Sequence, residues 1–113
     1  MITMLSWSDL KEDRTTKTLM QAIEQLGTHL IERDLLVSRS PLGERVIGTP
    51  MDTDEDRDER YFLTMRFRDR AQLDASYVYL QQNAEAANEA HLALFITFSS
   101  KCYICREDTD PAH

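Results

Sequence analysis

Strand-like alternation of hydrophobic and polar positions is clearest in residues 60–68. There one face carries Tyr61, Leu63, Met65 and Phe67, and the other carries Phe62, Thr64, Arg66 and Arg68. A period of two predicts a β-strand with one face in the core. Residues 2–7 alternate with apolar side chains on both faces, which indicates a strand that is buried or that faces a second copy. Residues 35–39 are β-capable and end at a turn signal around Pro41, so they predict another strand.

A helical spacing of three and four residues runs through 14–33. The positions that share its hydrophobic face are Leu19, Met20, Ile23, Leu26, Gly27, Leu30 and Ile31. This spacing predicts a helix that packs one face on a sheet. Its start is left open between Asp9 and Asp13, which are both suitable capping residues. Gly27 indicates either a close approach of the helix to the sheet or a kink, and His29 is expected to be a partly exposed surface histidine.

A second helix is predicted after Asp69, which acts as the N-cap with Gln72 at the third helical position. Its expected hydrophobic face carries Leu73, Tyr77, Leu80 and Ala84, and is widened by Ala75 and Val78. Residues 84–90 are rich in Ala and Asn, and they either continue this helix or connect it to the last strand.

The last strand is predicted to run from His91 to Arg106. A straight strand of that length would measure about 50 Å, too long for a domain of this size, so we expect a bend or bulge at Ser99–Ser100. After the bend the chain either continues along the same sheet or crosses to a partner subunit. Cys102 and Cys105 lie three residues apart and point to opposite faces of a strand, beyond disulfide reach. We therefore expect two free, reduced thiols.

Residues 43–59 are too polar to bury and longer than an ordinary connection. Six of the chain's twenty acidic residues lie within 52–59, at Asp52, Asp54, Asp56, Asp58, Glu55 and Glu59. We expect a mobile acidic loop at about residues 49–59 and a polar tail at 107–113. Asp52, Asp54 and Asp56 have the spacing of a calcium loop, but Arg57 stands where such a loop needs glycine. A solvated charge run is therefore the default interpretation.

The formal net charge of the 113 residues is −7, which repels nucleic-acid phosphates. The most apolar stretch, 92–98, is far shorter than the roughly 20 residues that a membrane-spanning helix requires. The sequence offers no glycine-rich phosphate loop, metal-ligand spacing or secretion signal. We expect one cytoplasmic domain over residues 1–113, with no cofactor, no metal, no nucleic-acid partner and no membrane contact.

The predicted element order is strand, helix, strand, strand, helix, strand. This is the ferredoxin-like β-α-β-β-α-β arrangement of the α+β class, with two helices on one face of a four-stranded antiparallel sheet. The other face would then carry Phe62 and one set of residues from each of the first and last strands. That is more apolar surface than a small monomer usually exposes. A homodimer in which two sheets face each other would cover it.

Four segments carry a resemblance to a known family. They are residues 61–74 (YFLTMRFRDRAQLD), 91–96 (HLALFI), 103–108 (YICRED) and 26–30 (LGTHL). These segments resemble a small uncharacterised bacterial family of dimeric ferredoxin-like proteins in the dimeric α+β barrel superfamily. That superfamily includes cofactor-free monooxygenases, stress-responsive barrels and haem-binding enzymes. The resemblance implies the fold and a homodimer but brings no catalytic motif, and the acidic excursion departs from it.

The leading hypothesis for function is a small-molecule site between the facing sheets. Trp7 and Phe62 would form aromatic walls, and Arg66, with Arg68, would hold a carboxylate or phosphate of the ligand. The alternative is that these arginines lie at a solvated sheet edge or pair with acidic residues.

Two further hypotheses stay open. One is a cofactor-free monooxygenase, in which His91 or a tyrosine removes a proton from a phenolic or enolic substrate. A surface or capping role is the plainer alternative for this histidine. The other hypothesis is a non-catalytic regulatory or structural dimer whose acidic loop contacts a basic partner.

Overall fold

The computed structural model of the chain describes the backbone of residues 1–82 and 98–109, and the side chains of 1–82 and 101–109. Its elements are β1 (Ile2–Leu10), α1 (Thr16–Glu32), β2 (Ser38–Arg39), β3 (Gly43–Glu44), β4 (Tyr61–Phe67), α2 (Arg70–Gln82) and β5 (Phe98–Glu107). The strands pair antiparallel in the order β2-β4-β1-β5, and β3 also pairs with β4. This is the predicted ferredoxin-like fold. No helix in the described ranges is long and apolar enough to cross a membrane.

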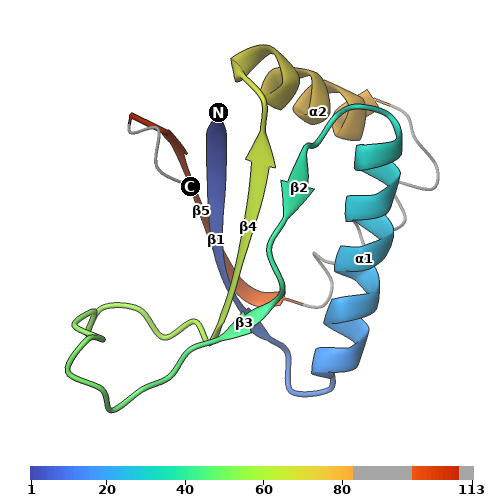
Figure 1. The fold of residues 1–113 in the computed structure, drawn as a ribbon. Helices are drawn as coiled ribbons and strands as arrows, with labels where there is room; N and C mark the ends of the chain where they lie inside the picture. Colours follow the sequence, from blue (N-terminus) through green and yellow to red (C-terminus); the bar gives the residue numbers. More distant parts are fainter. Residues whose placement is uncertain (83–97, 110–113) are drawn as a thin grey trace.

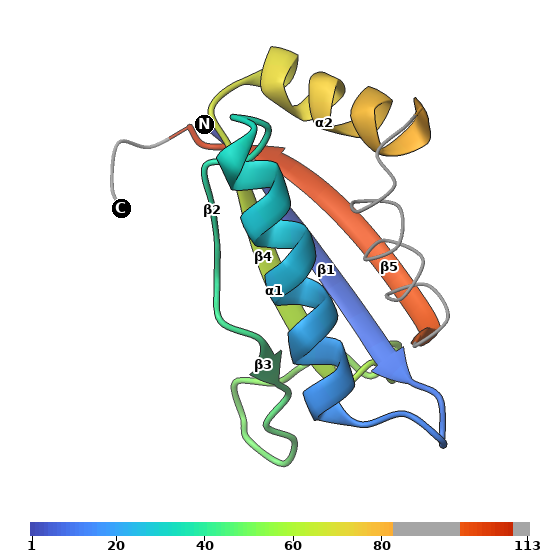
Figure 2. The same ribbon diagram turned by 90° about the vertical axis from the view of Figure 1, so that its right-hand side faces the viewer.

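Both helices lie on the same side of the sheet (Figures 1 and 2). The alternation predicted for β4 is confirmed, because Tyr61, Leu63, Met65 and Phe67 are buried while the residues between them are half-buried. The buried set packs with Ile2, Leu36 and the inner face of α1, formed by Leu19, Ala22, Ile23, Leu26 and Leu30. The hydrophobic core therefore lies between α1 and one face of the sheet.

Helix α1 begins later than either predicted cap. Thr15 is the N-cap, and its Oγ1 accepts a hydrogen bond from the Thr18 amide at 3.2 Å. Asp9 is unavailable as a cap because β1 extends to Leu10, three residues beyond the predicted strand, and its carboxylate pairs with Arg60 at 3.0 Å. Strand pairing on both sides of β1 thus overrides the local capping signal.

The buried face of α1 is narrower than the sequence predicts. Met20 and Ile31 are 49% and 43% exposed, so their assignment to the core was wrong. Gly27 does mark a close approach, because a Cβ atom there would lie 3.2 Å from the Arg39 side chain of β2. His29 is partly exposed as predicted, and its Nε2 lies 2.9 Å from the Tyr79 hydroxyl of α2.

Helix α2 buries polar residues that the sequence analysis did not assign to its inner face. Gln72 donates to the Asp34 carbonyl at 3.0 Å, and the Ser76 hydroxyl donates to the Leu35 carbonyl. Buried polar groups require such partners. Tyr77 and Val78 are 66% and 47% exposed, so their predicted core positions were wrong. Residue 84, the last predicted face position, lies outside the described residues.

The predicted cap of α2 is confirmed. The Gln72 amide donates to the Asp69 carboxylate at 2.9 Å, and the Gln72 side-chain oxygen accepts from the Arg68 amide at 2.6 Å. The first residues of α2 are therefore held by two reciprocal bonds.

The strand predicted at 35–39 is shorter in the structure, where β2 covers only Ser38–Arg39, and β3 follows it along the same edge of β4. The Val37 amide donates to the Arg66 carbonyl at 2.9 Å and the Ser40 amide to the Thr64 carbonyl at 2.8 Å. The pairing is interrupted at Pro41, which has no amide hydrogen, and resumes at β3. The expected turn is therefore an interruption within one edge strand rather than a reversal.

Strand β5 confirms the bulge expected near Ser99–Ser100. Asp9 pairs with Ser100 while Leu10 pairs with Phe98, which leaves Ser99 as the extra residue. After the bulge the chain continues along β1 of its own subunit, from Lys101 to Glu107. The predicted strand start at His91 lies outside the described residues.

The two cysteines are free and lie on opposite faces of β5, as predicted. Cys102 stands opposite Trp7 in the register, and Cys105 stands opposite Met4.

Candidate functional site

The face of the sheet turned away from the helices, here called the open face, brings the sequence-predicted aromatic residues together. Directly opposed residues of antiparallel strands share a face, so the register defines its members. They are Thr3, Leu5 and Trp7 of β1, Phe62, Thr64 and Arg66 of β4, and Cys102, Ile104 and Arg106 of β5. Of these, Leu5, Trp7 and Phe62 are half-buried, and Ile104 is 45% exposed.

Trp7 and Phe62 are neighbours in the register of β1 and β4. Their ring centroids lie 6.3 Å apart and their planes are nearly perpendicular, at 89°. An edge-to-face pair of this kind is a favourable aromatic arrangement. The two rings form an aromatic corner at the end of the open face that adjoins β3.

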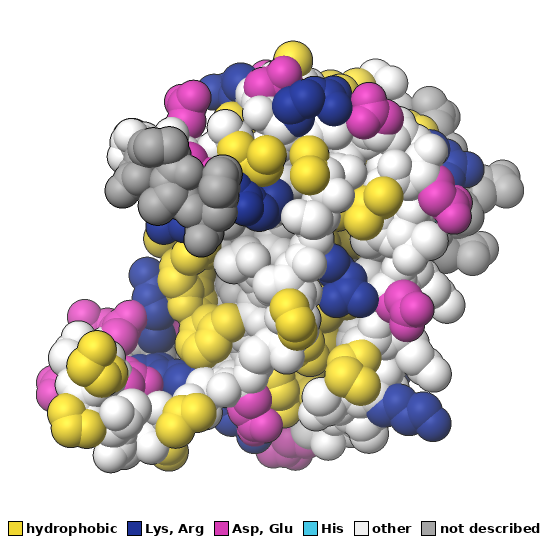
Figure 3. All heavy atoms as spheres, viewed as in Figure 1, with side chains coloured by type: hydrophobic (Ala, Val, Ile, Leu, Met, Phe, Trp, Pro, Cys, Tyr) yellow, Lys and Arg dark blue, Asp and Glu magenta, His cyan; other side chains and the backbone are white. Residues whose placement is uncertain are grey.

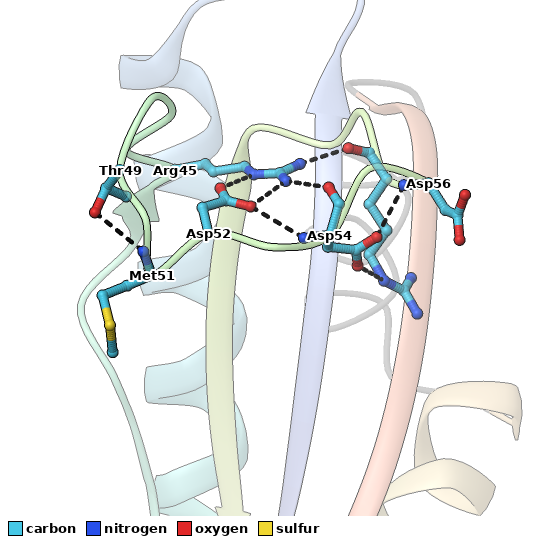
Figure 4. Close-up of polar contacts among 7 residues, drawn as sticks. Arg45, Thr49, Met51, Asp52, Asp54 and Asp56 are labelled. Atoms are coloured by element: carbon cyan, nitrogen blue, oxygen red, sulfur yellow. Dashed lines mark hydrogen bonds and ion pairs between the residues drawn. The ribbon is translucent and has the colours of Figure 1, made fainter.

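The segment between β3 and β4, residues 45–60, projects away from the helices on the side of the open face (Figure 1). Arg45 organises this loop, as Figure 4 shows. Its guanidinium binds the Asp52 carboxylate through two bonds of 2.5 and 2.6 Å, and it donates to the carbonyls of Asp54 at 2.6 Å and Arg57 at 2.5 Å. One guanidinium group therefore holds three residues of the acidic run together: Asp52, Asp54 and Arg57. The predicted mobility of the loop stays a prediction.

These contacts shift the titration of both partners. The hydrogen bond from Arg45 lowers the pKa of Asp52, and the same bond raises the pKa of Arg45. Both shifts favour the charged forms of Asp52 and Arg45, so the two side chains form an ion pair at neutral pH.

Arg57 connects the loop to the open face. Its guanidinium carbon lies 4.6 Å from the centroid of the Trp7 ring, a cation–π distance. Its Nε lies 2.9 Å from the Asp54 carboxylate, and its Nη1 lies 3.6 Å from Cys102 Sγ. The contact with Cys102, followed by nearby acids, raises the pKa of Arg57. Arg57 was not predicted as a site residue, although an arginine within an acidic run was a signal that could have indicated it.

A hollow of about 460 Å³ lies between the aromatic corner and the loop. Trp7 and Phe62 form its wall on the sheet, and the loop contributes acidic, basic and apolar side chains between Glu44 and Arg57. In Figure 3 the loop stands away from the body of the molecule, with a recess between the two. The volume is within the usual range of small-molecule sites.

Arg66 lies on the open face but does not line this hollow. It is four residues beyond Phe62 along β4, or about 13 Å at the rise of a strand. Its Nη2 binds the Asp108 carboxylate at 2.9 Å, while its buried Nε has no hydrogen-bond partner among the described residues. The structure thus separates this predicted site residue from the two aromatic ones.

The other two sequence candidates are Arg68 and His91, and of these Arg68 does not line the hollow. Arg68 pairs with the exposed carboxylate of Asp34 at 3.2 Å, near the end of α1. His91, the catalytic candidate, lies outside the described residues. Within the parts of the chain that the structure describes, no three His, Cys, Asp or Glu side chains are grouped as metal ligands.

Comparisons with solved structures place this fold beside several proteins of low sequence identity. A protein from Arabidopsis thaliana has a TM-score of 0.74 at 9% identity, with all of both chains covered. A dimeric ferredoxin-like protein of unknown function from Jannaschia sp. CCS1 has a TM-score of 0.71 at 16% identity, covering 95% of this chain and 98% of that one. The likeness establishes a shared fold.

A third similar structure is an enzyme. SnoaB, a cofactor-independent oxygenase from Streptomyces nogalater, has a TM-score of 0.66 at 8% identity, covering 96% of this chain and 93% of that one. No family model matches the sequence, and no curated protein is significantly similar to it.

Proposed function

We propose that this chain acts as a homodimer whose two open faces pack against each other. The half-buried apolar residues of the open face support this proposal, since a second copy would remove them from water. The projecting loop supports it as well, because Val46, Ile47 and Met51 are 73%, 77% and 89% exposed. Similar structures described as dimeric and ferredoxin-like add to this support.

The dimer binds a small organic molecule between the facing sheets, at the aromatic corner. The observation that carries this proposal is the hollow of about 460 Å³ against the perpendicular rings of Trp7 and Phe62. Aromatic walls with a few polar groups are typical of small-molecule sites. A second subunit over the open face would further exclude water from the hollow and strengthen its polar contacts.

Sedimentation tests the dimer. The native protein is expected to sediment at twice the 13.1 kDa mass of one chain at micromolar concentration. Leu5→Asp, on the open face, should shift the population to monomer because the interface would bury a charge. Val78→Asp is the matched control, since that residue is 47% exposed on α2, which lies on the helix side. A native monomer, or equal behaviour of the two variants, contradicts the proposed interface.

Tryptophan fluorescence tests ligand binding, because Trp7 is the sole tryptophan of the chain. A panel of phenols, aromatic acids and aromatic amines should include compounds that change its emission with saturation. Phe62→Ala should weaken the same compounds by about tenfold, through the loss of one aromatic wall. Arg66→Ala tests the sequence-based prediction of an anion held by that residue, and unchanged binding would exclude it.

A cofactor-free oxygenase activity is the second candidate function. The similar structures that are described as an antibiotic biosynthesis monooxygenase and as a cofactor-independent oxygenase favour it. Oxygen uptake with phenolic or enolic compounds that bind the hollow, compared with His91→Ala, tests it. A dimer that binds such compounds without consuming oxygen would be a binding protein, and a dimer that binds none would be regulatory or structural.

A further inference from the structure

We propose that the hollow selects an organic cation, a guanidinium or alkylammonium group, and that this ligand replaces Arg57 on the Trp7 ring. The inference rests on the proposed ligand site and adds the charge of its ligand. That charge is opposite to the one predicted from Arg66 in the sequence.

The position of Arg57 defines the recognition chemistry. Its guanidinium lies 4.6 Å from the centre of the Trp7 ring and pairs with the Asp54 carboxylate at 2.9 Å. Tryptophan is the strongest of the aromatic side chains in cation–π contacts. The protein therefore already provides a π face and a carboxylate arranged for a single cation.

An exchange of cations preserves these interactions. A ligand cation on Trp7 would keep the π contact and pair with Asp54 as Arg57 does now. The displaced side chain is about one-third exposed, so it has direct access to water. The hollow beside it, of about 460 Å³, has room for the rest of an organic molecule.

The charges around the hollow disfavour an anionic ligand. The carboxylates that line the hollow are Glu44, Asp52 and Asp54. Its two arginines are already engaged, because Arg45 makes four hydrogen bonds within the loop and Arg57 binds Asp54 and Cys102. An anion would have to break those contacts and approach three carboxylates, whereas a cation needs to replace only Arg57.

The test uses three probes of similar size that differ in charge: the cation benzylguanidinium, the neutral benzyl alcohol and the anion phenylacetate. Binding is measured by the emission of Trp7 at low millimolar concentrations and low salt. The native protein is expected to bind benzylguanidinium more tightly than the other two. Arg57→Ala should tighten benzylguanidinium by about tenfold, because the internal competitor for the ring is gone.

Arg60→Ala is the matched control for charge. Arg60 belongs to the same segment and lies over the Tyr61 ring at 5.4 Å, paired with Asp9, but does not line the hollow. Its removal adds the same net negative charge and should leave the affinity nearly unchanged. An equal gain in both variants would mean general attraction to an acidic surface and would overturn the proposal.

A second variant at residue 57 is needed because Arg57→Ala could also change the loop conformation. Arg57→Lys keeps a competing cation on the loop and should bind benzylguanidinium as weakly as the native protein. Trp7→Leu, followed by calorimetry, should abolish binding of the cation. Cation binding that survives Trp7→Leu, or preferential binding of phenylacetate, overturns the inference. A sedimenting dimer that binds phenylacetate or benzyl alcohol would still support the proposed function, so the two failures are distinguishable.

Discussion

The helix-covered face and the open face of the sheet are built from alternate residues of the same strands, yet they differ in burial and packing. On the covered face, Tyr61 and Leu63 are 5% and 8% exposed and pack against the residues of α1. On the open face, Phe62 is only half-buried, packs against Trp7 and lines the hollow that the projecting loop also lines. The covered face therefore holds the hydrophobic core, and the open face leaves apolar surface accessible, where we propose that a second copy and a ligand bind.

The largest expected difference between the faces concerns apolar truncation. Leu19 of α1 is fully buried against the covered face, at 0% exposure. Leu19→Ala should lower the free energy of unfolding by about 3 kcal/mol, through lost burial and the cavity left behind. Leu5→Ala on the open face should lower it by less than about 1 kcal/mol in the monomer, since that site is already partly exposed. Urea denaturation of both variants checks the comparison, and equal losses would contradict it.

A smaller effect is expected from the cap of α2, which lies on the covered side. The Asp69 carboxylate accepts a bond from the Gln72 amide at 2.9 Å. Asp69→Ala should cost about 1 kcal/mol of unfolding free energy, the usual value for an N-cap. Asp74→Ala is the control, because it removes an exposed i,i+4 pair with Arg70 and should cost only a few tenths of a kcal/mol. Thermal unfolding that ranks the two variants in the opposite order would contradict this role of Asp69.

The smallest expected effect is a pH dependence on the covered side. Burial, followed by the nearby charge of Arg33, lowers the pKa of His29 from its ordinary value of 6.5. The folded state therefore favours neutral His29, and its contribution to stability is fully present above pH 6.5. It is lost as the pH falls through the lowered folded pKa.

A comparison with His29→Gln isolates this contribution from other titrating groups. Unfolding midpoints in urea between pH 8 and pH 5 should fall more steeply for the native protein than for the variant. Parallel curves would mean that burial and the charge of Arg33 do not lower the pKa of His29 in the folded protein.

The fold could be predicted from the sequence where the hydrophobic pattern was strong and local. The alternation in 61–67 and the cap at Asp69 were both readable, because strand pairing and capping obey short-range rules. The core face of α2 could be predicted only in part: Leu73 and Leu80 pack against the core as predicted. Gln72 and Ser76 were not predicted there, because they are buried through hydrogen bonds to carbonyls of the distant residues 34 and 35. No local pattern indicates that a polar side chain will find a remote acceptor.

The candidate site, like the fold, could be predicted from the sequence only in part. Trp7 and Phe62 were predicted as aromatic walls and are adjacent across β1 and β4. Arg66 was predicted beside them but pairs with Asp108 farther along the face. Arg57 was missed because its place on the Trp7 ring depends on how the loop folds around Arg45.

The amino-acid sequence by itself determined the order of the main elements, the core face of β4 and the excess of acid in one loop. These properties follow from side-chain periodicity and composition, which act over a few residues. Only the tertiary structure decided that the loop turns back to the sheet and places Arg57 on Trp7. That contact joins residues 50 positions apart in the chain, and its formation depends on strand register and ion pairs that no short segment contains.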